Sequence, residues 1–252
     1  MSLKISNTLV MPHPRVRAFF YGATGSGKTT AAATFPTPLF LTPANEGSEL
    51  TLTGRSFDYI RLGLDDNGRP IGVRAHMTTV LGELEARFTK SLKVKSDEEA
   101  LALFPWETIV FESLTHYGDL LVEDIGQQGS KAMDQQSWGA FATHLRTVYN
   151  RLNNLDCHVV LTALEKVQVT DDKRTVGGPN FSGSMAVKLP SACDLIGYCV
   201  ATPKSAKDTA YRVHFRQHGP FAARSRFTGF PPFVDNFDFS DVERFFVGTK
   251  NS

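Results

Sequence analysis

The chain has 252 residues, of which 41% are hydrophobic and 21% are charged, and its formal net charge is +1. These values are typical of a soluble globular protein with one large core, and the small net charge gives no global signal for a nucleic-acid partner. No apolar run approaches the ~20 residues that a membrane-spanning helix needs. Cys157, Cys193 and Cys199 fit neither a zinc spacing nor a disulfide framework. We therefore expect a cytoplasmic protein with reduced, buried thiols and no membrane partner.

The predicted elements alternate between strands and helices through most of the chain. Apolar runs predict strands at 16–21, 39–42, 59–62, 108–112, 158–162, 195–200, 211–215 and 221–226. Helices are predicted at 28–34, 75–92, 114–125, 137–153 and 241–246. The segment 165–188 is rich in Thr, Asp, Lys, Gly and Ser, which indicates a hairpin or a mobile loop. The pattern predicts an α/β fold with a mainly parallel central sheet and antiparallel edge strands.

One segment carries a specific chemical motif between the first predicted strand and the first predicted helix. Residues 22–29 match G-x-x-x-x-G-K-[ST], in which glycines let the backbone aim its N–H groups at phosphate oxygens. The lysine of this motif reaches the β- and γ-phosphates, and the hydroxyl ligates Mg²⁺. We therefore predict ATP and Mg²⁺ as cofactors. The predicted nucleotide-binding residues are Gly22, Ala23, Thr24, Gly25, Ser26, Gly27, Lys28, Thr29 and Thr30.

Two acids follow predicted strands and are candidates for the chemistry at the phosphates. Glu112 ends an apolar run and is predicted to hold Mg²⁺ together with Thr29; the alternative is that it only caps the next helix. Glu46 follows the second strand and is predicted to orient or deprotonate the attacking water, with Glu49 as the alternative. His116 could line the same site or lie on a helix surface. Lys28 is predicted to stabilise charge on the phosphates during catalysis.

The order of these pieces resembles the RecA-like recombinase core. It is most similar to the small phage RecA-core ATPases associated with single-strand annealing and recombination. The matching pieces are Phe20 through Thr30, Phe35 through Gly47, Thr108 through Thr115 and Val159 through Ala163. The likeness predicts a RecA-like P-loop NTPase core at 16–230, preceded by an N-terminal segment at 1–15. It also predicts a C-terminal tail with a short helix at 231–252, and it places a phage-encoded protein in the cytoplasm of a bacterial host.

The resemblance implies self-assembly into a ring or filament. RecA-like ATPases generally bind nucleotide between protomers, and the neighbour contributes basic residues from a late strand with a Lys-x-Arg pattern. Arg224 and Arg226 stand at the corresponding place and are predicted to stabilise charge on the transferring phosphoryl group. The alternative is that both arginines are surface charges on an edge strand. A single-strand-binding protein or another replication or recombination protein is a further implied partner.

The resemblance also implies a DNA-binding loop after the 158–162 strand. Basic residues with an aromatic group on a flexible loop suit single-stranded DNA, because phosphate neutralisation and base stacking need no sequence readout. The predicted DNA-binding residues are Lys166, Lys173, Arg174, Phe181 and Lys188. Asp171 and Asp172 oppose this interpretation, and an ordinary solvated hairpin is the alternative. The prediction of a second DNA-facing loop at 126–136 depends on a single basic residue, Lys131.

The predicted function is therefore ATP hydrolysis, slow unless assembled, with single-stranded DNA binding and annealing or strand exchange. A helicase-loader or motor-type ATPase that acts mainly on a protein partner is the alternative. The sequence departs from the family at two places. Glu112 stands where an Asp is usual, and Leu164-Glu165 stands where relatives often carry a His or Gln that senses the γ-phosphate.

Overall fold

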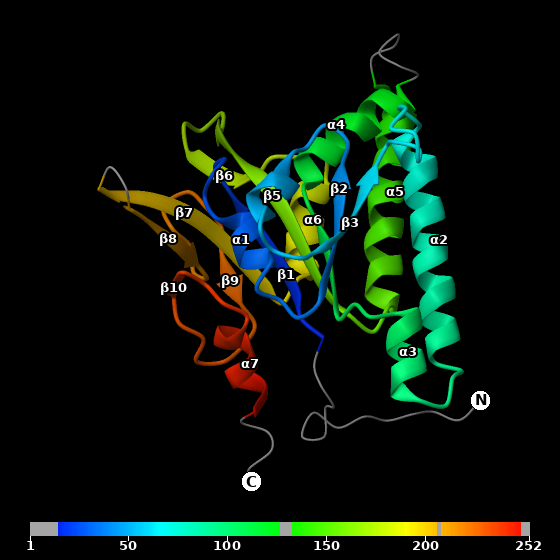
Figure 1. Cartoon of the computed structure of the whole chain (residues 1–252). Coiled ribbons are helices and arrows are strands. Elements are labelled where there is room, and N and C mark those ends of the chain that lie inside the picture. The colour runs from blue at the N-terminus through cyan, green and yellow to red at the C-terminus, as the bar shows by residue number, and fades with distance from the viewer. Residues whose placement is uncertain (1–14, 127–132, 206–207, 248–252) are drawn as a thin grey trace, which may run out of the picture.

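A computed structural model describes residues 15–126, 133–205 and 208–247 (Figure 1). Its 10-stranded sheet runs in the order β10-β8-β7-β1-β5-β4-β2-β3, with β6 paired to β5 and β9 paired to β7. The mutually parallel strands are β1 (Arg17–Gly22), β2 (Pro38–Pro43), β3 (Asp58–Leu62), β4 (Thr108–Phe111), β5 (His158–Val169) and β7 (Leu195–Ser205). The antiparallel strands are β6 (Thr175–Pro179), β8 (Asp208–His214), β9 (Arg224–Ser225) and β10 (Phe233–Asp235).

Helices cover both faces of the sheet. The helices are α1 (Lys28–Ala32), α2 (Val73–Ser91), α3 (Asp97–Leu103), α4 (Leu114–Ile125), α5 (Gln135–Asn154), α6 (Met185–Ala192) and α7 (Ser240–Val247), with a 3₁₀ turn, η2, at Ser48–Leu52. Buried side chains of α2, α4, α5 and α6 form one core with the sheet, and those of α1 and α7 form a second core on the opposite face. Strands such as β2 and β4 are buried along their whole length, which explains their continuous apolar sequences. The predicted α/β class, with antiparallel edge strands, is confirmed.

Local sequence fixes where several helices begin. The side chain of Ser113 accepts a hydrogen bond from the Thr115 N–H at the start of α4, and that of Asp134 accepts one from Ser137 at the start of α5. The start of α2 is stabilised differently, because Asp124 of α4 accepts the N–H of Arg74 over 2.8 Å. Within the described residues, no helix has both the length and the apolar character that crossing a membrane requires.

The structure adds elements that the sequence patterns did not predict. The segment 165–188 forms the β5–β6 hairpin, as one of the two alternatives expected, and then turns into α6. The helix α3 was also missed. Residues 231–247 of the segment predicted as a C-terminal tail pack on the core, because β10 extends the sheet and Phe237, Phe239 and Val242 are buried in the second core. Their burial is the reason that this region is not a separate appendage.

Strand order determines where the functional groups meet. The strand β5 lies between β1 and β4, and β4 lies next to β2. Since these strands are parallel, their carboxyl ends share one edge of the sheet, and the loops that follow β1, β2 and β4 converge there. This edge carries the glycine-rich loop, Glu46 and Glu112.

Candidate nucleotide site

The phosphate loop joins β1 to α1 and lies close to the neighbouring strand β7. A side chain at Gly22 would place its Cβ 2.3 Å from the carbonyl oxygen of Cys199, so only glycine fits there. Gly27, which precedes α1, has φ +86°, a left-handed conformation that favours glycine. The ring of Tyr211 on β8 lies against Gly27, since a Cβ added there would be 2.8 Å from Tyr211 Cδ1. No sequence signal linked Tyr211 to this loop.

Lys28 lies across the phosphate loop and is almost fully buried. Its Nζ donates to the carbonyl oxygens of Gly22, over 3.1 Å, and of Ala23, over 2.7 Å. Burial lowers the pKa of Lys28, while the nearby carboxylates of Glu112, Glu46 and Glu165 act in the opposite direction. The amine of Lys28 therefore lies near three acids at this edge of the sheet.

Thr29 and Glu112 meet at the same edge. The Thr29 hydroxyl donates to Glu112 Oε1 over 2.8 Å, and Glu112 is 2% exposed. Burial raises the pKa of Glu112 to about 7, although the bond from Thr29 and the charge of Lys28 lower it. Glu112 Oε2 is buried without a hydrogen-bond partner among the described residues. Hydroxyl and carboxylate oxygens are ligands that Mg²⁺ accepts directly or through water, so these two residues fit a magnesium site.

Glu46 and His116 form a pair beside this site. Glu46 follows β2 in a turn in which its N–H donates to Pro43 O over 3.0 Å. Glu46 Oε2 contacts Nδ1 of His116, which lies in the first turn of α4. Asn45 Nδ2 donates to the His116 carbonyl oxygen over 3.4 Å, so adjacent residues of the β2 loop contact the same histidine. The side chain of the alternative acid, Glu49, lies outside the described part of the structure.

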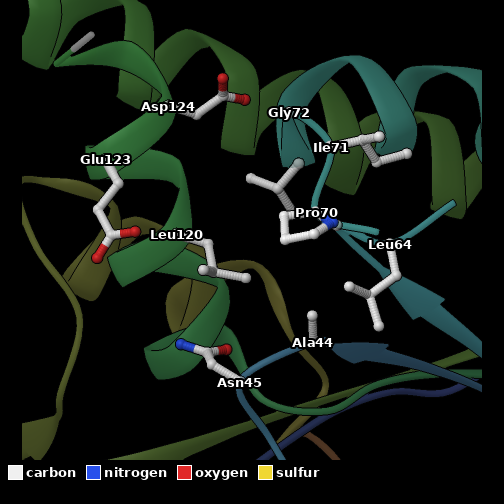
Figure 2. A pocket seen from close by; sticks show the side chains of 11 residues that line it. Ala44, Asn45, Leu64, Pro70, Ile71, Gly72, Leu120, Glu123 and Asp124 are labelled. Carbon is white, nitrogen blue, oxygen red and sulfur yellow. The ribbon is translucent and has the colours of Figure 1, made fainter. Parts of the chain in front are cut away.

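A cavity of about 710 Å³ adjoins this pair between α4, the start of α2 and the ends of β2 and β3 (Figure 2). Its lining includes Asn45, Leu120, Pro70, Glu123 and Asp124, of which the last accepts the N–H of Arg74. No residue of the phosphate loop lines it. The nucleotide phosphates are therefore expected to bind outside this cavity, on the other side of Glu46.

Arg224 and Arg226 lie away from the phosphate loop of their own chain. The strand β9 pairs with Leu195 and Ile196 at the amino end of β7, whereas Gly22 pairs with Cys199 further along that strand. Arg224 Nη2 donates to Ser191 O over 2.6 Å, and Arg226 Nη1 donates to Asp194 Oδ1 over 3.0 Å. These contacts connect β9 to the residues between α6 and β7. Their action on the nucleotide of a neighbouring protomer stays a prediction.

Phe181 is not available for base stacking, and its predicted DNA-binding role is wrong for this conformation. The side chain is 5% exposed, and its ring centroid lies 6.2 Å from that of Phe19 in the core. The apolar ring is more stable in the core than in water, and it packs among the buried residues of the first core.

The four basic residues predicted to bind DNA are spread over the β5–β6 hairpin and helix α6. Lys173 and Arg174 are exposed at the tip of the β5–β6 hairpin, Lys166 is half-buried on β5, and Lys188 is exposed on α6. Arg174 Nε lies 2.9 Å from Asp172 Oδ2 in an exposed ion pair. Lys131, on the second predicted DNA loop, falls outside the described residues.

Comparison with known proteins agrees with the chemistry of this site. Residues 15–227 match the model of the family described as the AAA domain. No curated protein matches the sequence. Among solved structures, a KaiC-like protein from the hyperthermophilic archaeon Pyrococcus horikoshii OT3 is similar with a TM-score of 0.41 and 13% identity, over 80% of this chain and 79% of that chain. Because the family model spans most of the sequence, the chain belongs to the AAA domain family of P-loop NTPases.

Proposed function

We propose that the chain hydrolyses ATP at this site while bound to single-stranded DNA in an oligomer, as a phage-type annealing or strand-exchange ATPase of the bacterial cytoplasm. The observation that supports hydrolysis best is the convergence of Lys28, Thr29, Glu112 and Glu46 at one edge of the sheet. Phosphoryl transfer to water needs positioning and charge stabilisation more than covalent chemistry by the protein. These four side chains supply both.

Each residue has a distinct task in this proposal. The amides of the phosphate loop bind the β- and γ-phosphates, and Lys28 neutralises their charge. Thr29, and Glu112 through water, would hold Mg²⁺, which supplies further charge neutralisation when bound. Glu46 orients the attacking water and accepts its proton as the new P–O bond forms and the bond to the leaving oxygen of ADP breaks. His116 is assigned a positioning role, because it contacts the carboxylate of Glu46.

The proposal of single-stranded DNA as partner is supported by the β5–β6 hairpin. This hairpin continues the strand that pairs with β1, and it presents Lys173 and Arg174 at its exposed tip. Cationic side chains in that position suit phosphates of a flexible strand. Arg224 and Arg226 would serve the nucleotide of a neighbouring protomer in the assembly.

The test is ATP turnover by the purified protein with and without single-stranded DNA, at low and moderate salt, while light scattering follows assembly. We expect DNA to promote assembly and turnover, and we expect added salt to weaken DNA binding. Lys173→Ala/Arg174→Ala should bind DNA more weakly than Lys90→Ala/Lys93→Ala, which removes two exposed lysines at the far end of α2. If nucleotide binds but DNA neither binds nor changes turnover, the annealing function is contradicted and a motor acting on a protein partner takes its place.

A further inference from the structure

A row of aromatic side chains crosses the sheet from its core to its free edge. Strand register places Tyr21 opposite Tyr198, Tyr198 opposite His214, and His214 opposite Phe233. Directly paired residues point to the same face of a sheet, and the ring centroids lie 5.3, 6.4 and 6.1 Å apart along this series. The four rings therefore form one continuous line over β1, β7, β8 and β10.

The loop that follows β8 adds a second tier of rings to this row. Phe221 stacks on Tyr198 with centroids 4.0 Å apart and an interplanar angle of 10°. His218 stacks on His214 with centroids 3.9 Å apart and an angle of 26°. Offset stacking at such distances is the geometry that aromatic groups, including nucleobases, adopt with one another.

The row passes from buried to exposed along its length. Tyr198 is 7% exposed, whereas Phe233 at the edge strand is 42% exposed, and His218 is exposed in its loop. Figure 1 shows β8 at the side of the molecule away from α2 and α5, the helices that help cover this face over the central strands. Rings at the outer end of the row thus face solvent.

Cationic groups border the exposed end. The guanidinium carbon of Arg212 lies 4.0 Å from the ring centroid of Phe233, and Asp235 holds this guanidinium through bonds of 2.6 and 2.9 Å. Arg216 is exposed between His214 and His218 in the sequence. A planar cation held over a ring extends the stack, and an exposed arginine in the loop that follows β8 can complement a phosphate.

We propose that this aromatic row, Tyr21, Tyr198, His214 and Phe233 with the second tier Phe221 and His218, binds single-stranded DNA by stacking bases on His218 and Phe233. The inference rests on the proposed function and gives the strand a stacking surface in place of the buried Phe181. Bases stack on exposed rings without regard to sequence, and Arg216 meets the backbone phosphates. Two stacked ring pairs bordered by arginine suit bases better than the apolar side chains of a protein partner.

The experiment measures binding of a fluorescently labelled oligothymidine of roughly 20 nucleotides to the full chain. We expect His218→Ala/Phe233→Ala to raise the Kd at least about tenfold, because two stacking partners are lost. Tyr59→Ala is the matched control, since Tyr59 is 53% exposed on the β3 edge at the other end of the sheet. Arg216→Ala should lower the salt dependence of binding, whereas the ring variants should leave that dependence unchanged.

A second variant distinguishes the loss of base stacking from a loss of folding. Phe233→Trp preserves the stacking face, so it should bind like the wild type, and its fluorescence should be quenched when the oligonucleotide is added. If the wild type binds the oligonucleotide and the ring variants bind equally well, the aromatic row is not the stacking surface, although the proposed function stands. If the wild type binds no oligonucleotide, both the proposed function and this inference are overturned.

Discussion

The hydroxyl of Thr29 donates a hydrogen bond of 2.8 Å to the carboxylate of Glu112, a residue 83 positions later in the chain. The contact joins the phosphate loop to the end of β4, although β5 separates β1 from β4 in the sheet. A buried carboxylate with one oxygen bonded and the other without a hydrogen-bond partner in the described part of the chain is suited to hold a metal-bound water. This relationship gives the first prediction.

Glu112→Gln should keep nucleotide binding but lower ATP turnover by about 100-fold, because a neutral amide holds Mg²⁺ and its bound water less well than a carboxylate does. The fold should tolerate the change, since the side chain is buried and burial already disfavours its charged form. Turnover, together with titration of ATP at several Mg²⁺ concentrations, checks this. Turnover equal to that of the wild type would place the metal elsewhere.

The Glu46–His116 pair gives a second prediction. Glu46→Gln should lower turnover by about 10²- to 10⁴-fold with an unchanged Kd for ATP, as expected when a general base is lost. His116→Ala should lower kcat less, by about tenfold, without changing ATP affinity, while His116→Gln should recover part of the rate because its amide can donate to Glu46. Glu83→Gln, an exposed acid on α2, is the control. An effect of His116→Ala on ATP affinity alone would argue against a positioning role.

The contact between Gly27 and Tyr211 predicts a strong effect of a single methyl group. Gly27→Ala should weaken ATP binding at least about tenfold, because its Cβ would meet the Tyr211 ring at 2.8 Å and its φ is +86°. Adding Tyr211→Ala should relieve the overlap but not the backbone strain, so recovery should be partial. Gly139→Ala on α5, where no atom lies within 4 Å of the added Cβ, should bind ATP normally. Titration with a fluorescent ATP analogue distinguishes these cases.

Two buried histidines predict a loss of stability in mild acid. His158 Nδ1 accepts the Val16 N–H over 3.0 Å, and His144 Nε2 lies 2.7 Å from the Tyr117 hydroxyl. Burial lowers the pKa of each from 6.5 to about 4. Between these values the unfolded chain binds more protons than the folded chain, so the free energy of unfolding falls as the pH decreases through this range.

We expect a loss of about 1–2 kcal/mol per histidine between pH 7 and pH 5. Urea unfolding at both pH values measures it. His158→Gln should show a smaller loss over the same interval, because its side chain does not titrate. Tyr59→Ala, at an exposed position on β3, is the control and should lose as much stability as the wild type. An identical pH dependence in His158→Gln would contradict the assignment.

The second core predicts that the C-terminal segment is needed for folding. Phe237 is 5% exposed, and its ring centroid lies 5.3 Å from that of Phe20 on β1. Phe237→Ala should therefore lower the free energy of unfolding by about 3–5 kcal/mol. Phe233→Ala, four residues earlier and 42% exposed, should cost far less. If urea unfolding showed the same loss of unfolding free energy for both variants, the segment would not pack as part of the core.

Local sequence patterns predicted much of the fold and the phosphate loop of the site. The phosphate loop is contiguous in sequence, so its glycines, Lys28 and Thr29 identify it without any knowledge of the sheet. Alternating apolar runs and helical spacings predicted the α/β class, because they report burial within each element. The short helix α6 was missed, since Pro190 lies inside it and a glycine-rich stretch precedes it.

The strand order of the sheet brings the other residues of the site together, and no local sequence pattern encodes that order. Glu46 and Glu112 were predicted from their places after strands, but the contact of Glu46 with His116 requires β2 and β4 to be neighbours. Phe181 looked like a loop aromatic and is a core residue, because burial is decided by the packing of distant helices and strands. The aromatic row likewise exists only through the register of four strands. The sequence by itself determined that this protein carries a P-loop, and tertiary structure alone decided which side chains gather around that loop, since each of these contacts joins residues far apart in the chain.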